Sequence, residues 1–258
     1  MLRPRGLLRA GQRALISLAL VAALPAAASA QDPPPPWLEM TIVGVEPAGV
    51  DDFLAAQQEL AAMEQAAGVP WRRVGRTAVF GDAYRFVILK PFTQFAGYAR
   101  PGRADADRAR VENRIERVVT SRESLALRAT HDIDSPLPED EEPALTLVQR
   151  VSVVPGKEQD YVRVMMEDVL PHFTEAEMHH STGAITLGGE GGYVHFFHFD
   201  NFAALDQGSP MARALGPEAA LEVMSKLAGA VSSTDQWLVR HLPELSFQEE
   251  TEEETPDH

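Results

Sequence analysis

The segment VEPAGVDDF, residues 45–53, has a counterpart in VVPGKEQDY, residues 153–161. Pro47 and Pro155 stand 108 residues apart. In each segment an apolar, β-like stretch meets a proline-containing turn and gives way to a helical pattern. Because recurrence at a fixed spacing is typical of an internal repeat, we expect the chain to hold two copies of one structural unit.

Both copies continue with the same order of elements. Apolar residues recur at three- and four-residue steps after each turn, which predicts a helix with one buried face. A glycine-containing hairpin follows, at residues 74–90 and 183–199, and then a broken helical region and a closing strand, at 124–130 and 236–242. This order predicts an α+β fold made of two tandem β-α-β-β-α-β units, each ferredoxin-like.

The two units are expected to pack as one body. A four-stranded sheet with helices on one face leaves its other face uncovered, and two such sheets can cover each other. We place the first ferredoxin-like unit at residues 37–132 and the second at residues 144–247. An acidic linker, residues 133–143, joins them, and residues 248–258 are predicted to be a disordered acidic tail.

The first thirty residues have the pattern of a signal peptide. Arginines precede an apolar run at residues 14–24, and Ala28-Ser29-Ala30 follows it, so cleavage is expected after Ala30. The run is shorter than a membrane span, which needs about 20 residues. We therefore predict an exported protein, periplasmic or secreted, with a Pro-rich spacer at residues 31–36 and no membrane span after cleavage; an uncleaved anchor is the alternative.

Composition narrows the chemistry. The chain has no cysteine, which removes thiolate catalysis and cysteine-ligated metals. Its formal net charge of −15 argues against nucleic acid as a partner. No HExxH pair, G-x-S-x-G elbow or P-loop is present, so no metal site is predicted and the catalytic residues are unknown.

The strand, Pro-Gly turn, helix and hairpin of residues 151–202 resemble the dimeric α/β barrel superfamily. That superfamily includes antibiotic-biosynthesis-type monooxygenases, NIPSNAP-type proteins and chlorite dismutase-like haem proteins. Its units usually pair as dimers, and fused copies can form the barrel within one chain. The resemblance implies an intramolecular dimeric α/β barrel, that is, a monomeric pseudo-dimer.

Three arginines are candidate ligand-binding residues. Arg128 and Arg240 occupy matching positions in the closing strands, and alternation puts them opposite an apolar set that includes Leu125 and Trp237. If the apolar set lies under the helices, both arginines face the space between the sheets, and Arg150 faces it too. Converging guanidinium groups favour an anion such as a carboxylate. The alternative is that each arginine forms a salt bridge at the rim.

Three histidines of the second hairpin are the other candidates. Neutral imidazoles can bind metal or haem or carry protons, which makes His180, His195 and His198 of interest. His195 and His198 are three residues apart and should face opposite sides of their strand, although His180 could meet one of them across the hairpin. Ordinary buried histidines are the alternative.

The expected function is the binding of a small organic ligand, anionic in one reading, between the two sheets. One alternative is an enzyme like the cofactor-independent monooxygenases, in which the protein holds an electron-rich substrate near oxygen. The other is a haem protein of the chlorite dismutase-like type, with His180, His195 or His172 as the axial ligand. No cofactor is predicted for the first two readings.

Overall fold

A computed structural model describes residues 37–99, 106–137 and 143–248. These residues belong to one compact unit, Pro35–His258. The expected signal peptide and Pro-rich spacer lie outside the described residues, as does the acidic tail beyond residue 248. Among the described residues, no helix is both long enough and apolar enough to cross a membrane.

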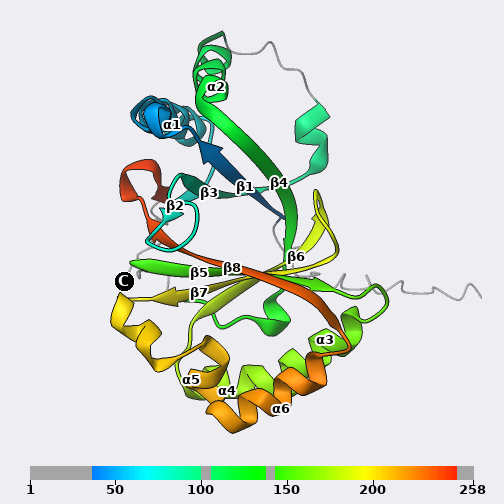
Figure 1. Cartoon of the computed structure of the whole chain (residues 1–258). Helices are drawn as coiled ribbons and strands as arrows, with labels where there is room; N and C mark the ends of the chain where they lie inside the picture. Colours follow the sequence, from blue (N-terminus) through cyan, green and yellow to red (C-terminus); the bar gives the residue numbers. More distant parts are fainter. Residues whose placement is uncertain (1–36, 100–105, 138–142, 249–258) are drawn as a thin grey trace, which may run out of the picture. The chain divides into compact units, whose positions relative to one another are not determined.

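The first half has the expected order of elements (Figure 1). Strand β1 (Trp37–Val45) passes through the 3-10 turn η1 (Pro47–Gly49) into helix α1 (Val50–Ala66). The hairpin of β2 (Trp71–Thr77) and β3 (Arg85–Phe92) follows. The 3-10 helix η2 (Phe95–Ala99), helix α2 (Ala106–Val118) and strand β4 (Val119–Ala129) complete the half.

The second half repeats this order with a more broken helical layer. After η3 (His131–Ile133) and β5 (Leu145–Val153), one helical stretch consists of α3 (Glu158–Val164), the π-helical turn η4 (Met165–Val169) and α4 (Leu170–Glu175). The hairpin is β6 (His180–Leu187) and β7 (Gly192–Phe199). Then come η5 (Phe202–Gln207), α5 (Pro210–Leu215), α6 (Pro217–Leu227) and β8 (Val231–His241). A short 3-10 turn, η6 (Pro243–Leu245), and strand β9 (Phe247–Gln248) follow.

The strands of both halves form one antiparallel sheet. Its order is β3-β1-β4-β6-β7-β5-β8-β2-β9, and β2 also pairs with β3. Within each half the order is the ferredoxin-like one, with the first strand between the third and the fourth. Three pairings cross between the halves: β4 with β6, and β2 with both β8 and β9. With the β2–β3 pairing, every strand from β1 to β8 therefore has a hydrogen-bonded neighbour on both sides.

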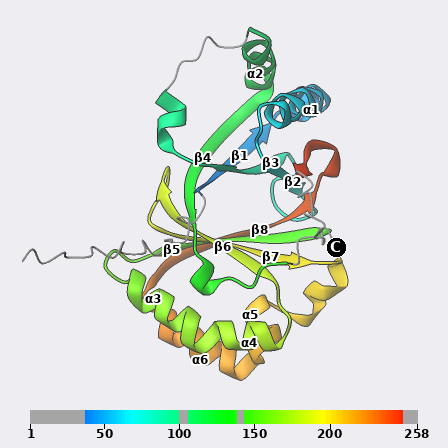
Figure 2. The ribbon, with the colours of Figure 1, turned by 180° about the vertical axis from the view of Figure 1, so that it is seen from behind.

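Three apolar cores follow from this arrangement. One lies under α1 and α2 and includes Phe53 and Phe86. A second lies under α3 to α6 and includes Phe173 and Phe197. The third consists of strand residues alone and fills the space between the two halves of the sheet: Met40, Val87, Leu125, Leu127, Val148, Val194, Phe196, Trp237 and Val239. Figure 2 shows the two helical layers from behind, with the strands between them.

The expected acidic linker is partly structured. Ile133 is 1% exposed and belongs to the core under α3 to α6. Ser135 forms a β-bridge with His180, so the chain joins the second half before residue 137. The reason is that Ile133 supplies an apolar anchor within an otherwise polar stretch. Residues 138–142 lie outside the described part of the chain.

Candidate functional site

The two matched arginines do not face the space between the sheets, so that expectation is wrong. Leu125 and Trp237 belong to the core of strand residues, which puts Arg128 and Arg240 on the opposite, helix-side face. The apolar set of the closing strands points into the core of strand residues between the two halves of the sheet. Arg240 is exposed and its guanidinium lies 5.8 Å from the centre of the Phe202 ring.

Arg150 does face the space between the two halves of the sheet, but its guanidinium forms a salt bridge with Glu123. Its Nη1 lies 2.8 Å from Oε1 of Glu123 on β4. Val148, two residues away on the same face of β5, belongs to the core of strand residues. The structure thus gives Arg150 the salt-bridging role that was the alternative, while Arg128 sits opposite Trp37 in the pairing of β4 with β1.

His195 and His198 face opposite sides of β7, as predicted. His195 is 1% exposed and shares hydrogen bonds with Tyr161 Oη (2.6 Å from Nε2) and Thr182 Oγ1 (2.9 Å from Nδ1). His198 lies on the interior face, with Nδ1 3.2 Å from Thr146 Oγ1. Burial lowers the pKa of His195 to about 3 and that of His198 to about 4, so both rings are neutral at pH 7.

His180 meets His195 across the hairpin. Their ring centres are 6.4 Å apart, and His180 Nε2 lies 2.7 Å from the carbonyl oxygen of Ile133. Burial lowers the pKa of His180 as well. Its Nδ1 is buried and has no hydrogen-bond partner among the described residues. These rings act as polar members of a packed core, and no group of three or more metal-ligating side chains occurs in the described ranges.

Two of the three histidines proposed as axial ligands, His180 and His195, do not fit haem. Phe197 packs against both buried histidines, with ring centres 5.4 Å from His180 and 5.9 Å from His195. Both nitrogens of His195 are already hydrogen-bonded, and the core around them is closed. His172 lies exposed on α4. A porphyrin at His180 or His195 would have to displace core side chains.

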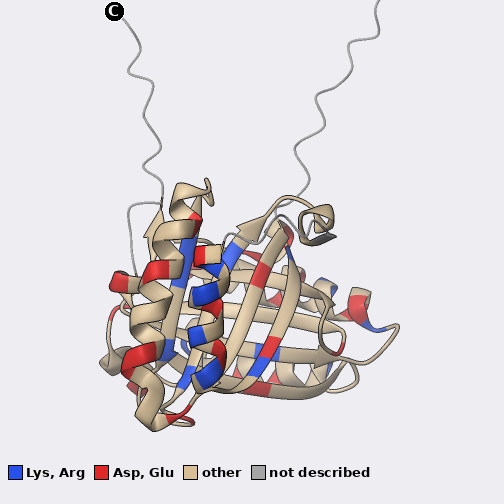
Figure 3. Cartoon of the chain, turned by 90° about the horizontal axis from the view of Figure 1, so that it is seen from above, with Lys and Arg blue, Asp and Glu red and all other residues tan. Residues whose placement is uncertain are grey.

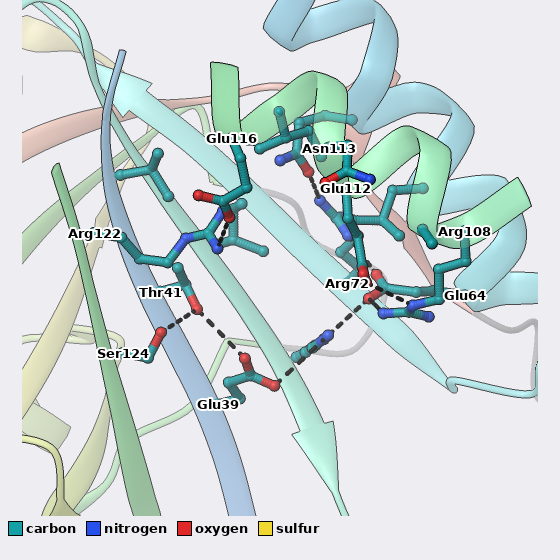
Figure 4. Close-up of a pocket in the computed structure, with 17 residues that line it drawn as sticks. Glu39, Thr41, Glu64, Arg72, Arg108, Glu112, Asn113, Glu116, Arg122 and Ser124 are labelled. Atoms are coloured by element: carbon teal, nitrogen blue, oxygen red, sulfur yellow. Dashed lines mark hydrogen bonds and ion pairs between the residues drawn. The ribbon is translucent and has the colours of Figure 1, made fainter. Parts of the chain in front are cut away.

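The most elaborate polar arrangement lies in the first half, in a pocket of about 450 Å³ between α1, α2 and the helix-side face of β1, β3 and β4 (Figure 4). We call it the charged pocket. Its basic residues are Arg72, Lys90, Arg108 and Arg122. Its acidic residues are Glu39, Glu64, Glu112 and Glu116. Thr41, Ser124, Gln57 and Asn113 add neutral polar groups. Figure 3 shows acidic and basic residues interspersed on this side of the molecule.

Glu64 organises the deep end of the charged pocket. Its side chain is 2% exposed and is contacted by Arg72, by Lys90 Nζ at 2.7 Å and by Arg108 Nη2 at 3.6 Å. Burial acts to raise the pKa of Glu64, but Lys90 and Arg72 outweigh it and hold the pKa below its ordinary value. The carboxylate is therefore ionised at neutral pH. Arg72, 1% exposed, is fixed further by Gln57, and its Nε has no partner among the described residues.

The outer part of the charged pocket consists of further ion pairs. Lys90 Nζ is 3.6 Å from Glu39 Oε2. Arg108 Nε donates to Glu112 Oε1 at 2.8 Å, and Arg122 pairs with Glu116. Each of the eight charged side chains therefore has a partner of opposite sign within the pocket.

Aromatic rings continue the pocket along the same face. Trp37 and Phe92 stand opposite each other one rung beyond Glu39 and Lys90, about 7 Å along the strands. Phe95 and Tyr98 of η2 pack on this pair with ring centres 4.9 to 5.3 Å apart. Tyr98 Oη donates to Glu39 Oε2 at 2.7 Å. Burial and Glu39 both raise the pKa of Tyr98, which keeps the phenol protonated as the donor. We call these four rings the aromatic cluster.

Sequence reasoning missed the charged pocket. One signal was present: Gln57 and Glu64 stand on the same helix face as Phe53 and Leu60, where apolar residues belong. Buried polar residues on such a face need partners, and here the partners come from three other elements. These partners lie far from Gln57 and Glu64 in the sequence, so the sequence pattern did not reveal that they form one pocket.

Comparisons with known proteins show which solved structures share this fold. No family model and no curated protein matches the chain. Among solved structures, a protein from Fusobacterium nucleatum described as a candidate monooxygenase matches at 10% identity, TM-score 0.59, over 81% of this chain and 93% of its own. An anthrone oxidase-like protein matches at 11% identity, TM-score 0.57, over 80% and 91%. A candidate chlorite dismutase matches at 11% identity, TM-score 0.50, over 80% and 95%. The chain shares the ferredoxin-like fold of these proteins, which confirms the resemblance at the level of fold.

Proposed function

We propose that this protein binds a small organic molecule in the charged pocket. The observation that supports this proposal is the pocket itself. It has a volume of about 450 Å³ and is lined by converging polar groups from four strands and two helices. Ligand sites of this size commonly combine such groups with adjoining apolar walls. The interior between the sheets, where the sequence pointed, is filled by the core of strand residues.

Native mass spectrometry of the protein purified from its own source tests this proposal. Ser124 is exposed and lines the pocket, so Ser124→Trp should fill it and remove a co-purifying small molecule. The matched control is Gln236→Trp, on an exposed position of β8 that does not line the charged pocket. Retention of the same mass by Ser124→Trp would refute the pocket as the site.

An oxygen-dependent enzyme is the second candidate. Two of the solved structures with this fold are described as a candidate monooxygenase and an anthrone oxidase-like protein. The polar groups of the charged pocket could hold an electron-rich substrate in place for its reaction with oxygen. Oxygen consumption with quinol substrates, lost in Ser124→Trp and kept in Gln236→Trp, would favour the enzyme over a binding protein.

We further infer that the chain is a tandem duplication closed into an intramolecular barrel. Two structural features that recur in both halves support it. The pairing of β1 with β4 shifts register between Gly44 and Val45, and that of β5 with β8 shifts between Ser152 and Val153. The amide of Glu46 donates to the carbonyl of Val118 at 2.9 Å, and that of Val154 to the carbonyl of Ala230 at 2.8 Å.

Separate expression of residues 37–137 and 143–248 tests the barrel. Each half alone would expose the apolar face that contributes to the core of strand residues, and two strand edges would lose their partners. We expect each half to aggregate alone and to form a complex when co-expressed. Two stable monomeric halves would refute the intramolecular barrel.

Export and the monomeric state complete the proposal. The Ala28-Ser29-Ala30 sequence after an apolar run supports cleavage before Gln31. N-terminal sequencing of the protein from its native cell fraction, together with its mass in solution, tests both points. A retained Met1 would contradict cleavage, and a stable dimer would contradict the monomer.

A further inference from the structure

We infer that the ligand of the charged pocket is an uncharged, polyhydroxylated ring compound, such as a sugar or a cyclitol. This inference rests on the proposed function and specifies the chemical class of its ligand. It follows from two features of the pocket: its internal charge balance and the aromatic cluster beside it.

The charge balance disfavours an anionic ligand. Four basic residues face four acidic ones, and each has a partner of opposite sign in the pocket. A carboxylate would find no surplus cation and would approach several glutamates. It would therefore have to break existing pairs, which costs free energy where the groups are partly buried.

The same pairs suit hydroxyl groups. A hydroxyl both donates and accepts, so it can bridge a carboxylate and a cation without separating them. Glu39 and Lys90 offer such a pair at the open part of the pocket, with side chains 25% and 21% exposed. Thr41 Oγ1 and Ser124 Oγ, 3.2 Å apart on the pocket floor, add two more groups that donate and accept. Several neighbouring hydroxyls on one ligand would use this arrangement best.

The aromatic cluster supplies the apolar complement. Phe95 and Tyr98 are 40% and 58% exposed, an unusual position for rings that are already packed against Trp37 and Phe92. Tyr98 is tied to the pocket through its hydrogen bond to Glu39. The aliphatic C–H face of a sugar ring, slightly positive, fits the negative face of an aromatic ring while its hydroxyls reach the ion pairs. A free cyclic polyol satisfies both surfaces at once.

Nuclear magnetic resonance of the full-length mature protein provides the test, because its three tryptophans give three indole N–H signals and Trp37 belongs to the aromatic cluster. The probes are glucose, N-acetylglucosamine and myo-inositol, with benzoate and citrate as anions. We expect at least one polyol to shift the Trp37 signal saturably and leave that of the interior Trp237 in place. Neither anion should do so.

Two variants sharpen the result. Glu39→Gln should weaken polyol binding about tenfold or more, because a hydrogen bond to a charged acceptor is lost. It should also strengthen benzoate binding, because Lys90 loses one of its two carboxylate partners. Asp168→Asn is the matched control: Asp168 pairs with Lys226 at 2.6 Å on the second half and should change neither affinity.

The results of these experiments distinguish the proposal that the pocket binds a ligand from the inference that the ligand is a polyol. Saturation of Trp37 by benzoate or citrate, with no effect of the polyols, would overturn the polyol class and leave a ligand-binding pocket in place. No shift with any probe would also overturn the polyol class, while a co-purifying molecule lost in Ser124→Trp would still support the proposed function. A polyol effect that Glu39→Gln leaves unchanged would overturn the assignment of the ion pair as its binding group.

Discussion

Glu39 and Lys90 face each other across β1 and β3, at the strand positions that Leu147 and Phe197 occupy across β5 and β7. The two halves share their architecture but differ here in chemistry. The charged pair borders the pocket under α1 and α2, whereas Leu147 and Phe197 help to form the closed core under α3 to α6. The ligand site is therefore expected in the first half alone.

Replacing the pair should convert the first half to the character of the second. Glu39→Leu combined with Lys90→Phe should abolish ligand binding. The protein should stay folded at reduced stability, because the new residues suit partly exposed positions but Glu64 loses one of its cations. Titration calorimetry with the identified ligand, beside circular dichroism of the variant, measures both effects. Undiminished affinity in a folded double variant would contradict the assignment.

Glu64 should matter far more to stability than the other glutamates of the pocket. Glu64→Gln leaves the buried Arg72 without its carboxylate and should lower the free energy of unfolding by about 3–5 kcal/mol. Glu112, 49% exposed and paired with Arg108, is the matched control, and Glu112→Gln should cost about 0–1 kcal/mol. Urea unfolding measures both variants. Similar losses in the two would show that Glu64 is not a buried counter-ion.

The hydrogen bond between Tyr161 and His195 should stabilise the second half. Tyr161→Phe leaves a buried imidazole nitrogen unpaired and should cost about 1–3 kcal/mol. Adding His195→Phe should recover part of this loss, because both polar partners are then gone. Denaturant unfolding of the wild type, the two single variants and the double variant gives the four free energies of a double-mutant cycle. Strictly additive losses would argue that the two groups do not interact.

Asp134 should give stability a pH dependence of unusual sign for a carboxyl group. Burial raises its pKa from 3.8 to about 7, so the folded state holds its proton where the unfolded chain has released it. Its contribution to stability is complete below about pH 4 and is lost as pH rises through 7. Asp134→Asn should therefore gain stability relative to the wild type as pH increases from 5 to 8.

The comparison with the variant is needed because the histidines act in the opposite direction. The lowered pKa values of His195 and His198 make their contribution complete above about pH 6.5, and it is lost as pH falls. The difference between the unfolding free energies of the wild type and Asp134→Asn, measured at several pH values, gives the contribution of Asp134 to the pH dependence of stability. A constant difference between them would contradict the raised pKa.

Local pattern predicted the order of elements well but misplaced the hairpin correspondence. The expected hairpins at residues 74–90 and 183–199, laid one on the other from their first residues, set His195 against Phe86. In the structure Phe86 pairs with Val43, whereas Val151, the counterpart of Val43, pairs with Tyr193. The ring centres of Phe53 and Phe86 are 4.7 Å apart and those of Tyr161 and Tyr193 are 4.9 Å apart, which supports the corrected register. Pairing with the first strand, not turn spacing, fixes a hairpin's register here.

The candidate site was harder to predict than the fold. Alternation assigned opposite faces to Leu125 and Arg128 correctly, but it could not say which face lies inside a closed arrangement of strands. The charged pocket depends on Glu39, Glu64, Lys90 and Arg108, which come from four separate elements. Helix periodicity could flag Glu64 as out of place. Only the three-dimensional packing shows which cations compensate it.

A crystal structure of the protein purified from its own source, with its small molecule retained, would show whether the charged pocket is the ligand site. We expect ligand density in the charged pocket, in contact with Glu39 and Lys90 and against the aromatic cluster. Density between the two halves of the sheet, displacing the side chains of Leu125 and Trp237, would contradict it.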